Sequence, residues 1–268
     1  MLIIWQRGIY YMDNSDKLRI FYENEGEEDL RLSNGGVHYL EYLTAVKYLD
    51  KYLKPGSRVI DSCAGSGVYA FYLADKGHAV TAGDIVMHNV KTMQKKQDKN
   101  PVLNEIYCGD ALRLGRFPDQ SFDAVLLMGA LYHLADAGDR KLAVNESRRV
   151  LKKDGVFVCT YMNRHAVIMN NASGSLDNID EILTFLGDGR EGIFYASTPG
   201  EMSGLMRECG LNQLCHVALD GISCLMYQTA KLIDETGLER WMRYHFAACE
   251  EPGLLGASYH NMLICKKI

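Results

Sequence analysis

Two glycines and an acidic residue follow successive apolar runs in this 268-residue chain. Gly65 and Gly67 come directly after the apolar run 58–62, where glycine lets the backbone pass close to a ligand without a Cβ atom in the way. Asp84 ends the next apolar run, and a carboxylate there can accept hydrogen bonds from both hydroxyls of an adenosine ribose. The pattern favours a nucleotide cofactor, although a packing turn and a helix N-cap would use the same residues.

Two further acidic residues separate the possible cofactors. Asp61 precedes Gly65 by four residues, which is unusual for a dinucleotide-binding loop, because that loop needs room for a pyrophosphate. S-adenosylmethionine carries a sulfonium and an ammonium group instead, and an acidic residue suits positive charge. Asp110, after a third apolar run, can accept from an adenine amino group or can lie in a solvent-facing turn. In register with one another, these positions favour the methyl donor.

The elements that position these residues alternate in type from residue 58 onward, as in a parallel sheet covered by helices on both faces. We expect strands at 58–62, 79–84, 103–108, 122–128 and 155–161, and helices at 67–76, 88–98 and 139–152. The remaining pattern predicts helices at 199–209 and 226–245, a strand at 211–219, and a last strand at 258–266 inserted antiparallel near the edge.

Two segments are expected to lie outside the sheet. Residues 1–55 predict an N-terminal helical cap that stops at Pro55-Gly56, and residues 163–198 predict an insertion on the side where strand ends carry ligands. Residues 56–268 then form the main domain, with a second insertion at 222–257, in one compact unit overall.

The residues from 56 to 161 resemble the class I S-adenosylmethionine-dependent methyltransferases in order, spacing and type. The resemblance rests on Asp61-x-x-x-Gly65-x-Gly67, Asp84, Gly109-Asp110-Ala111, Phe122-Asp123-Ala124-Val125 and Arg149-Val150-Leu151-Lys152-Lys153-Asp154-Gly155. It implies a Rossmann-like three-layer α/β sandwich with a seven-stranded, mostly parallel sheet and an antiparallel last strand.

The resemblance also implies roles at the cofactor site. Gly65 and Gly67 would flank the methionine portion, Asp84 would hold the ribose, and Ile85 would pack on the adenine. The remaining positions implied are Asp61 and Ala64 in the glycine loop, Asp110 and Ala111 at the adenine, and Met128, whose carbonyl would meet the ammonium group. Cys63 departs from the family, which usually has glycine there, and a positive φ at this residue would cost about 1 kcal/mol.

A narrower resemblance covers residues 127–134. Leu127-Met128-Gly129-Ala130-Leu131-Tyr132-His133-Leu134 is similar to the Gly-Pro-Leu-Tyr-His-Leu motif of a group of bacterial small-molecule methyltransferases, with Ala130 in place of the proline. The C-terminal residues 250–266 are similar to the closing motif of the same group. The resemblance implies a small-molecule acceptor and leaves its identity open.

Tyr132 and His133 follow the fourth predicted strand, where the donor methyl group should point. His133 could take a proton from the acceptor, because an imidazole titrates near neutral pH, or it could form a wall of the pocket. Tyr132 is expected to form a wall or a cofactor contact. Further polar candidates for the acceptor pocket, each also explained by packing or a surface position, are Tyr10, Tyr11, Arg31, Arg164 and His260.

Composition narrows the partners. A formal charge of −5 argues against binding to a phosphate backbone, so we expect no nucleic-acid partner. The eight cysteines include no C-x-x-C pair, which suits a reducing, cytoplasmic location, and no apolar run is long enough to span a membrane. No metal site is predicted.

The sequence therefore predicts an enzyme that transfers a methyl group from S-adenosylmethionine to a small acceptor by in-line displacement. Two alternatives stay open. The residues 65–70 also fit the glycine pattern of an NAD(P)-dependent oxidoreductase. A cofactor-binding regulatory protein without transferase activity would keep the same fold and the same loop.

Overall fold

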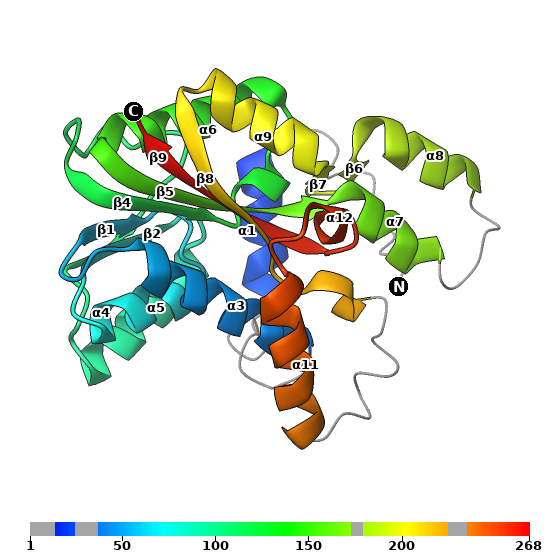
Figure 1. Cartoon of the computed structure of the whole chain (residues 1–268). Helices are drawn as coiled ribbons and strands as arrows, with labels where there is room; N and C mark the ends of the chain where they lie inside the picture. The colour runs from blue at the N-terminus through cyan, green and yellow to red at the C-terminus, as the bar shows by residue number, and fades with distance from the viewer. Residues whose placement is uncertain (1–13, 25–36, 173–178, 225–234) are drawn as a thin grey trace.

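The computed structural model describes residues 14–24, 37–172, 179–224 and 235–268, and the statements below concern these residues. Nine strands form one mixed sheet (Figure 1). In order across the sheet they are β3 (Glu105–Cys108), β2 (Ala79–Asp84), β1 (Arg58–Asp61), β4 (Phe122–Met128), β5 (Leu151–Asn163), β9 (His260–Lys267) and β8 (Leu211–Ala218), with β7 (Phe194–Ser197) and β6 (Arg190–Glu191) beside the end of β5.

The first seven strands of that order make the predicted sheet. The strands β3, β2, β1, β4 and β5 pair in parallel, whereas β9 lies antiparallel between β5 and β8. The prediction of a mostly parallel, Rossmann-like sheet with an antiparallel last strand is confirmed. Because the parallel strands share one carboxyl edge, the residues that follow β1 to β4 are gathered there.

The prediction that residues 163–198 lie outside the sheet is wrong for the strands β6 and β7 within this segment. β7 pairs in parallel with the last two residues of β5, with Met162 opposite Ala196 and Asn163 opposite Ser197. The pairing of β4 with β5 ends earlier, at Met128 and Thr160. β7 therefore pairs with the backbone groups of β5 that lie beyond the end of β4. A four-residue strand next to a two-residue one is too short to give a strand signal in the sequence.

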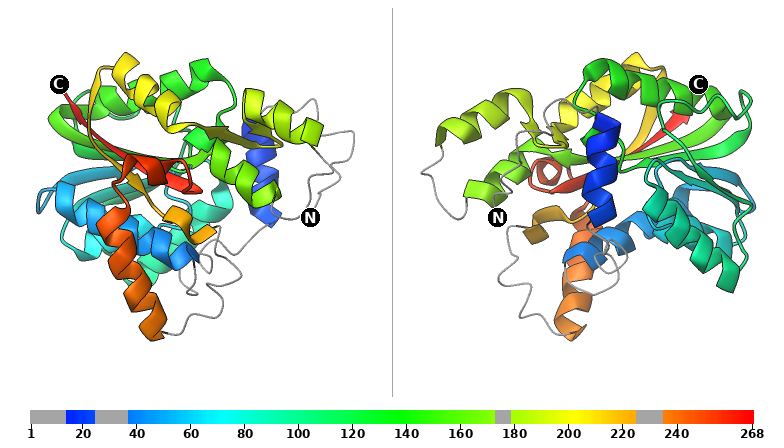
Figure 2. Two further views of the ribbon diagram at one scale, coloured as in Figure 1. Left: turned by 45° about the vertical axis from the view of Figure 1, so that its right-hand side comes forward. Right: turned by 180° about the vertical axis from the view of Figure 1, so that it is seen from behind.

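Helices cover both faces of the sheet, as expected for three layers (Figures 1 and 2). α3 (Val37–Tyr52), α4 (Val68–Asp75) and α5 (Met87–Lys99) pack on one face, and α6 (Ala137–Val150) and α9 (Pro199–Glu208) pack on the other. The helices that complete the described chain are α1 (Asn14–Asn24), α7 (Arg164–Ala172), α8 (Ile179–Asp188), α11 (Glu235–Ala248) and α12 (Pro252–Leu255), with the short 3₁₀ turns η2 (Leu131–His133) and η3 (Gly221–Cys224).

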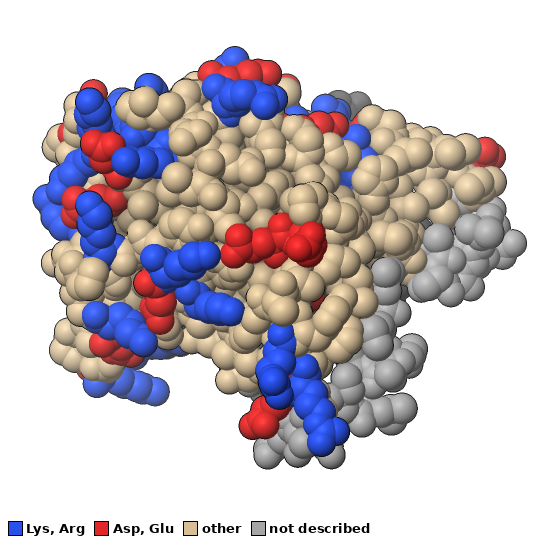
Figure 3. Space-filling view, in the orientation of Figure 1, with Lys and Arg blue, Asp and Glu red and all other residues tan. Residues whose placement is uncertain are grey.

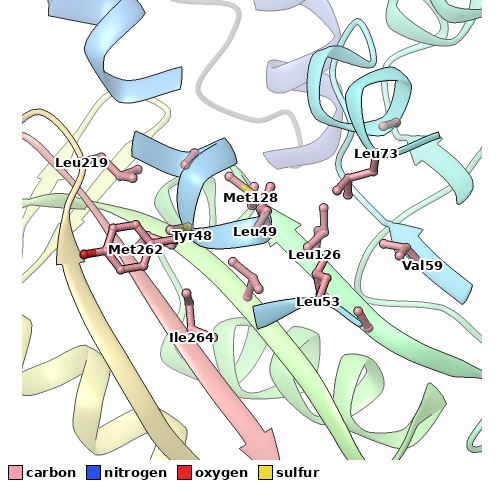
Figure 4. Close-up of a cluster of buried hydrophobic side chains, with 14 of the residues drawn as sticks. Tyr48, Leu49, Leu53, Val59, Leu73, Leu126, Met128, Leu219, Met262 and Ile264 are labelled. Carbon is pink, nitrogen blue, oxygen red and sulfur yellow. The ribbon is translucent and has the colours of Figure 1, made fainter. Parts of the chain in front are cut away.

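The N-terminal helix α3 is part of the main core. Its Tyr48 and Leu49 pack with Leu126 of β4 and Met262 of β9 in one buried apolar cluster (Figure 4). The Tyr48 hydroxyl also donates to Glu250 Oε1 at 2.6 Å. The helix α3 thus joins the early part of the chain to the C-terminal part.

The described surface carries mixed charge. In the view of Figure 3, basic and acidic side chains are interspersed and do not form a large face of one sign. Within the described ranges, no helix combines the length and the apolar character that a bilayer crossing requires.

Candidate functional site

The turn after β1 is shaped by its two glycines. Gly65 has φ of 56° and Gly67 has φ of 89°. Residues other than glycine adopt this left-handed backbone conformation only at a cost in free energy. A Cβ atom on Gly67 would also lie 2.9 Å from Phe71 and from Met93. Cys63 has no positive φ, because the non-glycine residues of the described chain with positive φ are Gln120 and Asp154. The strain considered for Cys63 is therefore absent.

Asp84 ties this turn to the end of β2. Its carboxylate accepts hydrogen bonds from the backbone N–H groups of Gly65 and Val86, both at 2.8 Å, and from the Asn89 side chain at 3.2 Å. Burial raises its pKa, and these hydrogen bonds offset part of that effect. A carboxylate has about four acceptor positions, so Asp84 keeps capacity for a ligand hydroxyl.

Asp61 is the most unusual group of the site. It is 1% exposed, and neither of its carboxylate oxygens has a hydrogen-bond partner within the described residues. Burial raises its pKa to about 8, and the nearby Asp84 adds to the shift. The backbone N–H of Cys63 acts on the pKa in the opposite direction. Burial of a carboxylate without a hydrogen-bond donor costs free energy unless a ligand supplies the donor. A positively charged ligand would compensate this cost best.

Tyr107 on β3 is a member of the site that the sequence prediction missed. Its ring fills the space over two glycines: an added Cβ atom would lie 2.1 Å from the ring at Gly83 and 2.8 Å from it at Gly109. Its hydroxyl is buried without a hydrogen-bond partner in the described structure. Glycines at the end of β2 and directly after β3 were the signal in the sequence that a large ring packs there.

The other predicted cofactor residues lie along the same edge. Ala64 donates its N–H to the Gly83 carbonyl at 2.9 Å, and the Asp110 carboxylate accepts from the Leu112 N–H at 2.9 Å in a local turn. Ile85 follows β2, the buried Ala111 follows Asp110, and the buried Met128 ends β4. The structure thus brings the predicted positions together at the carboxyl ends of four neighbouring strands.

His133, in the turn after β4, contacts one group at each of its two ring nitrogens. Its Nδ1 lies 3.3 Å from the Ile193 carbonyl, which can only accept, so Nε2 accepts from the Tyr22 hydroxyl of α1 at 2.8 Å. Burial lowers the pKa of His133 to about 4, so the ring is neutral at pH 7. Tyr22 gave no signal in the sequence, because its partner lies more than a hundred residues away in the chain.

Aromatic rings line this side of the site. Tyr132 lies between His133, at 4.7 Å between ring centroids, and His260, at 6.4 Å. The ring of Tyr259 contacts His260 at 5.0 Å, and Phe194 contacts His133 at 5.1 Å. Tyr22 of α1 also contacts His133, at 5.5 Å between ring centroids. The wall suits a planar, apolar ligand.

Two buried carboxylates meet His260 beside these rings. Its Nδ1 lies 3.2 Å from Asp220 Oδ2 and 3.4 Å from Glu41 Oε2. The sequence named His260 as a further candidate but did not name either acid. Glu41 precedes His260 by more than two hundred residues in the chain, so no local pattern joins them.

Arg164 has a structural role. Its guanidinium is buried and donates to the Ala196 carbonyl at 3.1 Å and to Glu201 at 3.1 Å, which ties α7 to β7 and α9. Tyr10, Tyr11 and Arg31 lie outside the described residues. Among the residues that are described, no group of three or more His, Cys, Asp or Glu side chains is arranged to hold a metal ion.

The part of the chain that contains this edge is similar to a known family of domains. Residues 60–159 match the family described as a methyltransferase domain. A 2-phytyl-1,4-naphtoquinone methyltransferase of Synechococcus elongatus is 32% identical over 142 residues, which cover 51% of this chain and 57% of that protein. A demethylmenaquinone methyltransferase of Lysinibacillus sphaericus is 31% identical over 110 residues, or 40% of this chain and 45% of that protein. The chain spans about half the length of these curated relatives.

Solved structures show the same fold. A methyltransferase of Methanosarcina mazei has a TM-score of 0.57 at 18% identity and covers 82% of this chain and 97% of its own. A 1,6-didemethyltoxoflavin-N1-methyltransferase of Burkholderia thailandensis, solved with its substrate and S-adenosylhomocysteine, has a TM-score of 0.57 at 13% identity and covers 94% of this chain and 87% of its own.

Proposed function

We propose that this chain is an S-adenosylmethionine-dependent methyltransferase that acts on a small-molecule acceptor. The observation that carries the proposal is Asp61, a buried carboxylate without a hydrogen-bond partner in the described structure, beside the glycine turn and Asp84. A sulfonium donor with an ammonium group supplies the positive charge that such a site lacks. The methyltransferase-domain match over residues 60–159 supports the same donor.

In this proposal, different residues hold the methionine part and the adenosine part of the donor. Asp61, Ala64, Gly65 and Gly67 would hold its methionine part, with the Met128 carbonyl as a further acceptor for the ammonium group. The positions proposed for its adenosine part are Asp84 at the ribose and Ile85, Asp110 and Ala111 at the adenine. The site fits the group because Asp61 is a buried carboxylate without a hydrogen-bond partner in the described structure and Asp84 keeps acceptor capacity.

The protein's own contribution is alignment. The bound donor supplies an already activated methyl group, so the chain must hold the acceptor in line with the methyl carbon and exclude water. Positioning of this kind can lower a barrier by roughly 7 to 11 kcal/mol. The acceptor atom then forms its bond to the methyl carbon as the bond from carbon to sulfur breaks, which leaves S-adenosylhomocysteine.

Tyr132 and His133 form the acceptor wall in this proposal. Of the two roles that the sequence left open for His133, its contacts with Ile193 and Tyr22 favour the wall, because both ring nitrogens already have partners. The wall would receive a small organic molecule, as the names of the quinone methyltransferase relatives also suggest for those proteins. A cytoplasmic location, where thiols stay reduced, is part of the proposal.

Calorimetric titration tests the proposal. We expect S-adenosylhomocysteine to bind and to raise the unfolding temperature, because a ligand at one hundred times its Kd stabilises a protein by about 2.7 kcal/mol. We expect no binding of NAD. Binding of NAD without S-adenosylhomocysteine would identify an oxidoreductase instead. Cofactor binding without formation of product across a broad acceptor panel would favour a regulatory protein.

A further inference from the structure

Tyr107 carries a buried hydroxyl group that the packing of its ring does not require. The residue is 5% exposed, and its hydroxyl oxygen has no hydrogen-bond partner among the described residues. A buried hydroxyl without a partner costs free energy, and phenylalanine would fill the same space without that cost. The hydroxyl therefore indicates a role other than packing.

The ring that carries this hydroxyl is held by its neighbours. The guanidinium carbon of Arg116 lies 4.7 Å from the centre of the Tyr107 ring, and the ring of Phe117 meets it edge-on at 5.3 Å between centroids. Gly83 and Gly109 provide space that a Cβ atom would otherwise fill. Because these contacts fix the ring, the hydroxyl oxygen has a defined position, and only its hydrogen can rotate toward a partner.

The strand register shows the direction in which the hydroxyl extends. Tyr107 of β3 lies opposite Gly83 of β2, and the preceding residue of β2, Ala82, lies opposite Asp61 of β1. The ring atom nearest to an added Cβ atom at Gly83 is Cζ, which carries the hydroxyl, at 2.1 Å. Neighbouring strands lie about 4.8 Å apart, so the ring spans the gap from β3 to β2. The hydroxyl therefore extends across β2 toward the end of β1, where Asp61 lies.

Asp61 is an acceptor that matches this donor. Its carboxylate receives no hydrogen bond within the described ranges, so Asp61 lacks a donor and the Tyr107 hydroxyl lacks an acceptor. The two groups also influence each other: burial raises the pKa of the Tyr107 hydroxyl, and the charge of Asp61 raises it further. Buried polar groups of this kind are usually satisfied by a ligand or by a bound water molecule.

We propose that Tyr107 is a positioning residue of the donor site, whose hydroxyl donates to the Asp61 carboxylate, directly or across one water molecule, once that acid holds the ammonium group of the donor. This inference rests on the proposed function. The Asp61 carboxylate then accepts from both the ammonium group and the hydroxyl, and the hydroxyl stabilises its ionised form. Tyr107 thereby favours ligands that carry the ammonium group over ligands that have the adenosine part alone.

Donor binding is then coupled to the loss of a proton from Asp61. Burial raises the pKa of Asp61 to about 8, so this acid is mostly protonated at pH 7 in the unliganded chain. The ammonium group and the Tyr107 hydroxyl both favour the carboxylate, so Asp61 gives its proton to the solvent on binding. The other titratable groups that act on the pair are Asp84 at Asp61, and Cys63, Arg116 and Glu105 at Tyr107.

Calorimetry of the full chain with two related ligands tests the proposal. S-adenosylhomocysteine carries the ammonium group, whereas 5′-methylthioadenosine has the same adenosine part and sulfur atom without it. Tyr107→Phe keeps the ring and should weaken binding of S-adenosylhomocysteine at pH 7 by about ten- to a hundredfold, as expected for the loss of a hydrogen bond to a charged group. The affinity of the same variant for 5′-methylthioadenosine should stay within about twofold of that of the wild type.

A double-mutant cycle tests whether the hydroxyl acts through Asp61. In Asp61→Asn, which has no ionisable group at this position, Tyr107→Phe should change the affinity for S-adenosylhomocysteine by no more than about threefold. The wild type should also release about one proton on binding at pH 7, measured in buffers with different ionisation enthalpies. Tyr107→Phe should release fewer protons, because the ionised form of Asp61 is less favoured in its complex.

Unfolding in urea separates this role from a structural one. Tyr107→Phe should leave the stability of the unliganded protein unchanged or raise it, because the variant removes a buried hydroxyl that has no partner in the described structure. Tyr161→Phe is the matched control, because Tyr161 is also buried but its hydroxyl lies 2.8 Å from His216 Nε2. Tyr161→Phe should lower the stability and leave the affinity for S-adenosylhomocysteine unchanged.

The outcomes separate this inference from the proposed function. Equal affinity of the wild type and Tyr107→Phe for S-adenosylhomocysteine would overturn the role of the hydroxyl. An equal loss of affinity for both ligands, or the full loss in the Asp61→Asn background, would show that Tyr107 acts through packing and would overturn it as well. Failure of the wild type to bind S-adenosylhomocysteine would instead overturn the proposed function.

Discussion

Partners and burial, more than residue type, set the charge of each group in this site. Asp84 and Asp61 end neighbouring strands and are both buried, but Asp84 receives backbone donors and Asp61 receives none within the described structure. His133 and His260 lie on either side of Tyr132, but the first meets a carbonyl and the second meets two carboxylates. In each pair, two residues of the same type therefore have different surroundings.

Asp61 should make the unliganded protein less stable as the pH rises. Its pKa is raised from 3.8 to about 8 in the folded chain, so between these values the folded state holds a proton that the unfolded chain has lost. The free energy of unfolding therefore falls as the pH rises from 4 to 8. Asp61→Asn should remove this fall, with a gain on the order of 3 to 5 kcal/mol at pH 8, measured by urea unfolding.

The same substitution should weaken binding of S-adenosylmethionine by about ten- to a hundredfold, because a hydrogen bond to a charged group is lost. Calorimetry at pH 8 measures this change. Asp123→Asn is a suitable comparison, because Asp123 pairs with Lys152 near the amino end of the strands. Tight binding of the donor by Asp61→Asn would show that Asp61 does not meet its positive charge.

At the scale of the elements, the carboxyl edge of the sheet depends on one large ring. Tyr107 of β3 lies over Gly83 at the end of β2, and its ring also contacts Phe117 at 5.3 Å. Gly83 accepts from the Ala64 N–H of the glycine turn. Packing at Tyr107 is therefore coupled to the conformation of the turn that is proposed to hold the donor.

Gly83→Ala should disturb both packing and donor binding. The added Cβ atom would lie 2.1 Å from the Tyr107 ring, which cannot move without displacing its neighbours. We expect a loss of roughly 1 to 3 kcal/mol in the free energy of unfolding, typical of an overpacked core. Gly115→Ala is the control, because no atom lies within 4 Å of its added Cβ atom. Equal stability of the two variants would contradict this account of the ring.

At the scale of the whole molecule, the early part of the chain completes the core and the site. α3 contributes Tyr48 and Leu49 to the main apolar cluster and Glu41 to the contact with His260. Thr44 of α3 also lies 2.9 Å from Nε2 of His245 in α11. The predicted division into a cap at 1–55 and a domain at 56–268 stays a prediction, and these contacts argue that the second part depends on the first.

A chain of residues 56–268 should fail to fold cooperatively. Removal of residues 1–55 uncovers the face of the sheet that Leu49 and Leu53 cover, and loss of one such buried leucine alone typically costs 2 to 5 kcal/mol. Near-ultraviolet circular dichroism and a thermal melt measure the outcome. Leu49→Ala in the full chain provides the graded comparison and should fold with lowered stability. A native-like melt of the shortened chain would show that α3 is a dispensable cap.

The sequence by itself determined the order of the main strands and the positions of the glycines and acids along them. These features are local: an apolar run ends at Asp61 or Asp84, and Gly65 and Gly67 follow directly. Because parallel strands end at one edge, a linear pattern of this kind is enough to predict that the residues meet. The resemblance to a family then added expected roles for the same positions.

Only the tertiary structure decided what surrounds them. The burial of Asp61, the contact of Tyr22 with His133, and the meeting of Glu41 with His260 all join residues far apart in the chain. Solvent exclusion and such contacts depend on packing, which a single sequence does not record. The pairing of β7 with β5 was hidden for the same reason, since it uses backbone groups that become available only where β4 ends.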